Sequence, residues 1–326
     1  MPRKTLLCYL ALSVVLAASP LVLNTYWVDV LNSVGLYAIL GLSLNITLGQ
    51  AGLFNLGHAA FYAVGAYTAA ILNTRYEIPI MWLLPVCAMA AAVFAAIVVR
   101  PIIRLRGDYL CIVTVGVGEI VRIALVNDIF GIQRPHLFGF IVRRPEHFFY
   151  FIWAFVAITV FLFTRLEHSR FGRALNYLRE DEVAAEGSGI NTAYYKLAAF
   201  VIGAAWAGIA GGIFAAKMTI IAPESFSFWE SVLVFALVIL GGAGSTPGVL
   251  VGSFVIIGLP ELFREFAAAR MLFFGAAMIL MMIFRNQGIL PARPRLYLLD
   301  EFRSTVEGAG AAEGAGEKVA ETEEVL

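Results

Sequence analysis

Apolar segments that are long enough to cross a lipid bilayer recur along almost the whole chain, separated by breaks that carry charged residues, proline or glycine. A transmembrane helix needs about 20 consecutive, mostly apolar residues. The pattern therefore predicts an all-α, polytopic membrane helical bundle of about ten transmembrane helices. We place the crossings near residues 5–23, 28–48, 57–73, 80–99, 108–126, 148–164, 195–216, 228–243, 247–263 and 270–284. The segments 57–73 and 228–243 are short enough to be partial or tilted crossings.

Composition supports a lipid environment and excludes several classes of function. Of the 326 residues, 60% are hydrophobic and 14% are charged, whereas a soluble domain carries about 25% charged residues. The net charge is zero, so no overall field points to nucleic acid. The cysteines and histidines lack metal-ligand or nucleophile–base spacing, and no phosphate-binding Gly-x-x-x-x-Gly-Lys-[Ser/Thr] loop is present. We therefore expect a transport protein with no cofactor and no metal site, and not an enzyme.

The basic residues are distributed unevenly between the two sides that these crossings define. Cytoplasmic loops of membrane proteins are enriched in lysine and arginine. With the N-terminus inside, 15 of the 23 basic residues fall on the inner side and seven on the outer side. We therefore predict that both termini are cytoplasmic. The first segment also resembles a secretory signal, and its long apolar stretch favours a retained helix without excluding cleavage.

Two domains follow from the change in composition near the C-terminus. Residues 1–299 form the predicted transmembrane permease domain, with a cytoplasmic loop at about 166–195. Residues 300–326 are rich in glycine, alanine and glutamate. Such a segment buries too little apolar area to offset its ordering entropy, so we predict a disordered acidic tail.

The predicted cytoplasmic loop at 166–195 is amphipathic and compatible with helix formation. It is far longer than a simple helix connection requires. Basic residues precede the acidic run Glu180, Asp181 and Glu182, small residues follow at Ala184 and Ala185, and Gly189 suits a helix C-terminus. The spacing alone gives equal weight to a docking surface for a cytoplasmic partner and to a solvated loop helix.

A polar, glycine-rich stretch from Gln50 to His58 follows the second predicted crossing and carries Gln50, Asn55 and His58, and Asn45 lies near the end of that crossing. Polar side chains at bilayer depth require contact with protein or with a water-filled cavity. We therefore predict a broken or re-entrant segment beside a translocation path, with these four residues along it. For His58 alone, a hydrogen-bonded packing role is favoured over pH sensing or proton relay.

Two further patterns concern helix packing. Glu119 and Arg122 stand three apart on one face of the fifth crossing, and we favour a mutually neutralising pair over a substrate contact. Small residues cluster in two groups, at Gly203, Gly208, Gly211 and Gly212 and at Gly244, Gly248 and Gly252. Such spacing lines a helix face along which another backbone approaches closely, in this chain or in a second subunit.

Several motifs resemble those of known transport proteins. Glu182-x-Ala184-Ala185-x-x-x-Gly189 is similar to the coupling-loop motif of ABC importer permeases. The stretch Leu44 to Phe61, the block Arg104-Leu-Arg-Gly-Asp-Tyr-Leu110 and the block Gly118-Glu-Ile-Val-Arg122 resemble the branched-chain amino acid permease family. The Arg104 block and the run Ser169 to Leu175 resemble its M-type member more than its H-type member.

This resemblance implies a set of partners and a set of contact residues. The expected partners are a second, H-type permease subunit, two cytoplasmic ABC ATPase subunits and an external substrate-binding protein, in the lipid bilayer of a bacterial inner (plasma) membrane. ATP hydrolysis is expected on the separate ATPase subunits. The residues expected at the ATPase contact are Arg179, Glu180, Asp181, Glu182, Ala184, Ala185 and Gly189.

Three functional hypotheses remain. The first is a permease subunit that couples ATPase closure to alternating access for branched-chain amino acids. The second keeps this machinery and changes the cargo to urea, short amides or another small polar solute. The third is an ion-coupled secondary transporter or channel that relays protons or ions through His58, Glu119 and Arg122. The scarcity of acidic residues in the crossings makes the third hypothesis the weakest.

Overall fold

The computed structural model describes residues 24–105, 107–127, 145–218 and 221–262, with isolated residues or short pieces at 20, 275, 279, 283–285 and 288–291. The chain divides into two compact units, Met1–Ala292 and Arg293–Leu326, and every described residue belongs to the first. The predicted crossings at 5–23 and 270–284 lie almost entirely outside the described residues. The predicted tail at 300–326 lies wholly outside them.

The described residues form helices and contain no strand, which confirms the predicted all-α fold. Five helical segments are long and apolar enough to cross a membrane: Thr25–Gln50, Ile80–Ile102, Tyr109–Val126, Glu146–Glu167 and Thr192–Lys217. They belong to α2 with its π-helical extension, Thr25–Asn45 and Ile46–Gln50, and to α4, Ile80–Ile102, α5, Asp108–Val126, α6, Pro145–Glu167, and α9, Thr192–Lys217. Each coincides with a predicted crossing.

The other predicted crossings within the described residues fall on shorter or less apolar helices. Residues 57–73 fall on α3, His58–Tyr76. Residues 228–243 fall on α10, Phe228–Gly241, which is preceded by a short 3₁₀ helix, Pro223–Phe226. Residues 247–263 fall on a run made of α11, Thr246–Ser253, a π-helical turn, Phe254–Gly258, and α12, Leu259–Leu262.

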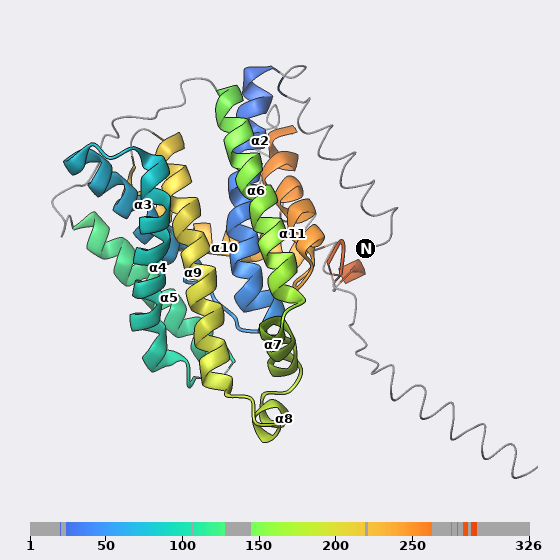
Figure 1. The fold of residues 1–326 in the computed structure, drawn as a ribbon. Helices are drawn as coiled ribbons and strands as arrows, with labels where there is room; N and C mark the ends of the chain where they lie inside the picture. The colour runs from blue at the N-terminus through green and yellow to red at the C-terminus, as the bar shows by residue number, and fades with distance from the viewer. Residues whose placement is uncertain are drawn as a thin grey trace, which may run out of the picture. The chain divides into compact units, whose positions relative to one another are not determined.

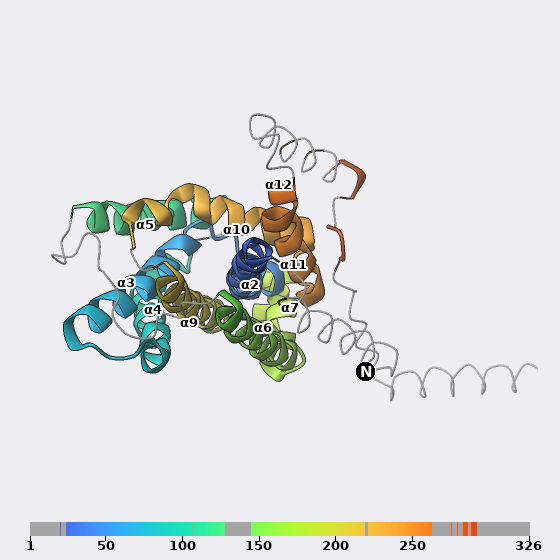
Figure 2. The same ribbon diagram turned by 90° about the horizontal axis from the view of Figure 1, so that it is seen from above.

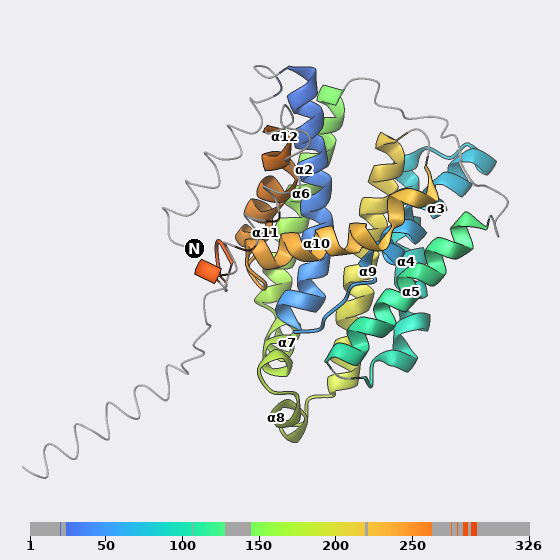
Figure 3. The same cartoon turned by 180° about the vertical axis from the view of Figure 1, so that it is seen from behind.

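Helix α2 lies among its neighbours, whereas α5 lies at the edge of the described bundle. Figure 2 shows α6, α9, α10 and α11 around α2, with α5 at the periphery. Figure 3 shows α10 crossing the bundle at a steep angle to α2. In the most apolar stretch of each helix, 78% of the α2 residues and 17% of the α5 residues are buried. Helix α2 is therefore enclosed by protein on most sides.

Small residues allow the tight packing that the sequence predicted. A Cβ atom added to Gly65 of α3 would lie 2.2 Å from the Gly208 carbonyl oxygen of α9, and one added to Gly211 would lie 2.3 Å from the Tyr62 carbonyl oxygen. The partner helices therefore belong to this chain. In the second group Gly248 approaches α10, but the prediction was wrong for Gly244, which lies with φ of 88° in the turn between α10 and α11.

Candidate translocation and coupling site

The polar stretch after α2 is a break in the helical structure, as the sequence predicted. Helix α2 ends at Asn45, the chain continues through the π-helical turn Ile46–Gln50, and α3 begins only at His58. We call the whole stretch Asn45–His58 the broken segment. The four predicted path residues are all enclosed, with exposed fractions of 2% for Asn45, 3% for Gln50 and 1% each for Asn55 and His58. Single π-helical turns occur often at functional sites.

Three of these four side chains hold the broken segment together. The Asn45 side-chain oxygen accepts a hydrogen bond from the Gly244 backbone N–H at 2.8 Å. The Asn55 side-chain oxygen accepts one from the backbone N–H two residues further on, at 3.0 Å. The His58 Nε2 atom lies 2.7 Å from the Ser43 hydroxyl. Buried polar groups are normally paired in this way, so the geometry of these three fits a packing role.

Gln50 differs from the other three. Within the described part of the chain, its buried Oε1 atom has no hydrogen-bond partner. Leaving a buried acceptor unpaired costs about 1–3 kcal/mol. Among the predicted path residues, Gln50 is therefore the one whose side-chain acceptor no described protein group uses.

Two neighbouring helices fix the end of the broken segment. The backbone N–H of Leu56 donates to the Thr114 hydroxyl of α5 at 3.2 Å, and the backbone N–H of Ala59 donates to the Ser231 hydroxyl of α10 at 3.0 Å. A Cβ atom added to Gly57 would lie 2.0 Å from the Thr114 carbonyl oxygen. The segment is therefore clamped between α5 and α10.

Sequence reasoning missed one polar pair inside the bundle. The Tyr37 hydroxyl of α2 donates to Glu230 Oε1 in the first turn of α10, at 2.5 Å. The pair was missed for two reasons. Glu230 lies near the start of its predicted crossing, where a carboxylate is expected at the membrane surface, and its partner is 193 residues away in the sequence. An acidic residue within a crossing was the available signal, because such residues are expensive in lipid and often functional.

The predicted pair on α5 is confirmed. The Nε and Nη2 atoms of Arg122 each lie 2.8 Å from Glu119 Oε2. The two side chains remain exposed over about one third of their surface, 33% for Arg122 and 34% for Glu119. Pairing lowers the cost of holding two charges on a membrane helix.

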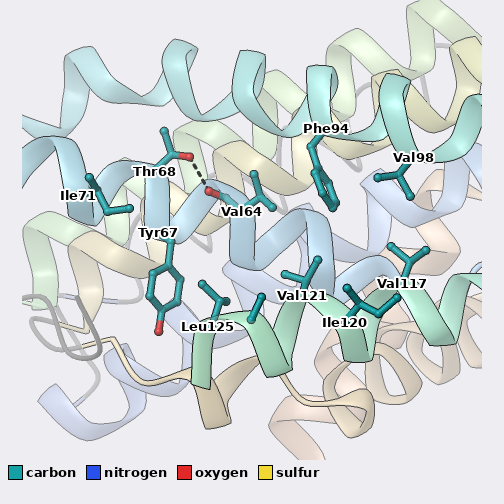
Figure 4. A pocket seen from close by; sticks show the side chains of 11 residues that line it. Val64, Tyr67, Thr68, Ile71, Phe94, Val98, Val117, Ile120, Val121 and Leu125 are labelled. Carbon is teal, nitrogen blue, oxygen red and sulfur yellow. Dashed lines mark hydrogen bonds between the residues drawn. The ribbon is translucent and has the colours of Figure 1, made fainter. Parts of the chain in front are cut away.

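An apolar pocket of about 460 Å³ lies among α3, α4 and α5 (Figure 4). None of the lining residues, which all belong to the described helices, carries a charge. The Thr68 hydroxyl on its wall donates to the Val64 carbonyl oxygen of its own helix at 2.7 Å. The lining therefore lacks the charged groups that would recognise both ends of a free amino acid.

The predicted cytoplasmic loop folds into two short helices, α7, Arg170–Glu180, and α8, Glu182–Gly187. We call residues 170–189 the coupling segment. Figure 1 shows α7 and α8 beyond the adjoining ends of α6 and α9, with α8 the farther of the two. The Asp181 carboxylate caps α8 by accepting hydrogen bonds from the Val183 and Ala184 N–H groups at 2.8 and 3.0 Å.

Gly189 ends α8, as the sequence predicted. Its φ is +84°, a left-handed conformation that favours glycine. The Ile190 N–H donates to the Ala185 carbonyl at 3.1 Å, and the Gly189 N–H donates to the Glu186 carbonyl at 2.9 Å. These two bonds are the Schellman pattern of a helix C-terminus. Helix α8 is therefore only six residues long but capped at both ends.

The structure divides the seven predicted contact residues into two groups. Glu180, Asp181, Ala184 and Gly189 are exposed. The other three contact the rest of the protein: Ala185 is 4% exposed, Glu182 Oε1 lies 2.6 Å from the Lys196 ammonium nitrogen, and Arg179, although exposed as a residue, donates from Nη1 to the Gly49 carbonyl oxygen at 2.5 Å. Sequence reasoning did not select Val183, whose side chain is 66% exposed at the tip.

Comparison with known proteins identifies the family. A family model described as the permease component of branched-chain amino acid transport systems matches residues 26–282. The high-affinity branched-chain amino acid transport system permease protein LivM of Escherichia coli (strain K12) is 40% identical, over 90% of this chain and 77% of its own. A probable LivM of Methanocaldococcus jannaschii is 27% identical, over 80% of this chain and 92% of its own.

The comparison also separates the two permease types. LivH of Salmonella typhimurium is 27% identical over 69% of this chain and 80% of its own, so this chain is more similar to LivM, as its motifs predicted. No solved structure matches the chain significantly. The chain therefore belongs to the family of permease components of branched-chain amino acid transport systems.

Proposed function

We propose that this chain forms half of the membrane pathway of an ATP-driven importer of branched-chain amino acids. The other half is an H-type permease, two ABC ATPases bind on the cytoplasmic side, and an external binding protein delivers the substrate. The substrate class is that of the relatives LivM and LivH, which are permeases of branched-chain amino acid transport systems, and LivM of Escherichia coli is 40% identical to this chain. As a member of this permease family, the chain is a transport subunit, with ATP hydrolysis on its partners.

One observation carries the proposed contact with an ATPase. Helix α8 stands at one end of the described helices and presents Val183 and Ala184 to its surroundings. An exposed valine beside an exposed alanine, on a helix that is fixed by caps at both ends, offers a small apolar surface in a defined orientation. Such a small, rigid apolar surface fits binding in a groove of a partner protein better than it fits a loop that only connects two helices in solvent.

The proposed orientation places α8 in the cytoplasm. The basic residues support it, since 15 of 23 lie on the same side as the coupling segment when the predicted crossings alternate. In this arrangement both termini are cytoplasmic, and the protein lies in the bacterial inner membrane. Cysteine-accessibility labelling of Val183→Cys from each side of the membrane tests the orientation, and labelling from outside the cell would contradict it.

The proposed path passes the broken segment. Gln50 is the residue proposed to face it, because its Oε1 atom is buried and unpaired among the described residues. Asn45, Asn55 and His58 shape the same segment by hydrogen bonding to Gly244, Gly57 and Ser43. A translocation path needs polar groups at bilayer depth, and this segment supplies them.

The test replaces Ala184 in the complete complex of two permeases and two ATPases. Ala184→Arg places a long charged side chain on the exposed face of α8, and we expect it to abolish leucine uptake into proteoliposomes and the stimulation of ATP hydrolysis by the binding protein. Ala184→Ser is the matched control and should transport normally. Full uptake by Ala184→Arg would overturn the proposed contact. Leucine transport by the purified chain without ATPases would instead support an ion-coupled transporter.

A further inference from the structure

A single side chain joins the coupling segment to the broken segment. Arg179 lies in the last turn of α7, one residue before Glu180 and two before the cap of α8. Its Nη1 atom donates to the carbonyl oxygen of Gly49, inside the π-helical turn, at 2.5 Å. The two residues are 130 positions apart in the sequence. Arg179 was expected at the ATPase, yet its guanidinium is directed toward the membrane bundle.

The lack of a side chain at Gly52 lets this arginine lie against the broken segment. Gly52 has φ of +70°, and a Cβ atom there would lie 3.0 Å from Arg179 Cγ. A Cβ atom on Gly49 would lie 2.3 Å from the Gly244 backbone nitrogen. The Arg179 stem therefore lies against Gly52, and Gly49, which accepts its hydrogen bond, is itself packed closely against Gly244.

The contact continues beyond Gly49 to the turn between α10 and α11. Asn45, one turn before Gly49, accepts a hydrogen bond from the Gly244 N–H at 2.8 Å. Gly242 and Gly244 in this turn have φ of 119° and 88°. Physical coupling between distant sites is carried by packed and hydrogen-bonded elements of this kind. The contacts thus run from α7 through the broken segment to the turn between α10 and α11.

The chemistry of Arg179 suits this role. The last carbonyl groups of a helix have no partner within it and carry partial negative charge, which a cation stabilises. A guanidinium holds a fixed, planar orientation through its hydrogen bond, whereas an ammonium is a mobile point charge. The position of the Arg179 side chain, and not only its charge, therefore depends on the position of the Gly49 carbonyl group.

We propose that Arg179 is a positioning residue that transmits movement of the coupling segment to the broken segment, so that ATPase closure reshapes the path. This inference rests on the proposed function. It assigns to Arg179 the transfer of movement within the permease and not the binding of the ATPase.

The test measures coupling in the complete complex, with Arg179→Met, Arg179→Lys and the matched control Arg170→Met. Arg170 is exposed on the same helix. We expect Arg179→Met to keep the ATPases bound and hydrolysing ATP. The ATP consumed per leucine imported should rise about tenfold, the order by which coupling between two sites changes an affinity. Arg179→Lys should fall between Arg179→Met and the wild type, and Arg170→Met should match the wild type.

A spectroscopic signal separates transmission from a purely structural role. Phe54 in the broken segment is 43% exposed and accepts a fluorophore as Phe54→Cys, and Val183→Cys reports on the tip. In Arg179→Met the tip signal should still respond to ATP while the Phe54 signal does not. An unchanged ratio of ATP to leucine, or an ATP response at both probes, overturns the inference. If Ala184→Arg transports normally, the proposed ATPase contact fails instead, and if the purified chain imports leucine without ATPases the proposed function fails, whatever Arg179→Met does.

Discussion

The broken segment and the coupling segment are both polar and glycine-containing, yet they use their polar residues in opposite ways. In the broken segment, Asn45, Asn55 and His58 are almost fully enclosed and bind groups of the protein itself. In the coupling segment, Glu180 and Asp181 are exposed to solvent, and an apolar residue, Val183, is also exposed. The broken segment thus buries polar side chains, whereas the coupling segment exposes polar side chains together with an apolar one.

The difference follows from what surrounds each segment. Where protein and lipid exclude water, every polar group needs a protein partner, so a conspicuous asparagine or histidine is most simply a support for the backbone. Where water is present, polar groups need no partner, and the informative feature is an apolar side chain that remains uncovered. Functional hypotheses should therefore start from the unpaired group in the first region and from the exposed apolar group in the second.

The largest effect is expected from adding a side chain where the broken segment lies closest to the backbone of α5. Gly57→Val should destabilise the protein by about 3 kcal/mol or more, because overpacking of this kind forces backbone to move and the Thr114 carbonyl oxygen lies only 2.0 Å from the added Cβ. Gly187→Val in α8 is the matched control, since no atom lies within 4 Å of its added Cβ. Thermal unfolding in detergent measures both, and equal stability of the two variants would remove the contrast between the segments.

A smaller loss is expected when one buried hydrogen bond of the broken segment is removed. Asn45→Leu leaves the Gly244 N–H without its side-chain acceptor, which should cost about 1–3 kcal/mol. The comparison is Ser188→Ala, since the Ser188 hydroxyl is exposed and donates to the Ala184 carbonyl on the surface of α8. Denaturant titration of both variants measures the difference. A Ser188→Ala loss as large as that of Asn45→Leu would contradict the role given to burial.

Loss of the N-cap of α8 should destabilise this helix locally and change the stability of the whole protein little. Asp181→Ala removes the side chain that accepts from the Val183 and Ala184 N–H groups, and loss of an N-cap costs about 1 kcal/mol. Hydrogen exchange should accelerate at these two amides while the unfolding temperature of the bundle stays nearly constant. Asp181→Asn keeps an oxygen acceptor, so the exchange rates of the Val183 and Ala184 amides should stay near those of the wild type. Unchanged exchange in Asp181→Ala would show that the cap is dispensable.

Sequence patterns predicted the helices well because hydropathy and length report directly on membrane crossing. The fifth predicted crossing, 108–126, has the same bounds as α5, and the break after Asn45 was signalled by its polar residues and glycines. The Glu119 and Arg122 pair was accessible because residues three apart share a helix face. Local spacing gave no information beyond such contacts between near neighbours in the sequence.

Long-range pairings were not accessible from the sequence. Arg179 and Gly49, and Tyr37 and Glu230, are separated by 130 and 193 residues. Nothing in local spacing distinguishes an arginine that meets a partner protein from one that turns back onto its own fold. For the same reason Ala184 and Ala185 looked equivalent, although only Ala185 is buried.

The smallest effect on stability is expected at Gln50. The same substitution best separates a residue that stabilises the backbone from one that contacts the transported solute. Gln50→Met keeps the length of the side chain and removes the Oε1 atom that has no partner among the described residues. Removing an unpaired buried acceptor relieves a desolvation cost, so stability should stay the same or rise by about 1 kcal/mol. Leucine uptake should fall, with a higher KM, because a polar contact for the passing solute is lost. If Gln50→Met instead destabilises the protein as much as Asn45→Leu with transport intact, Gln50 supports the backbone like its neighbours, and the path lies elsewhere.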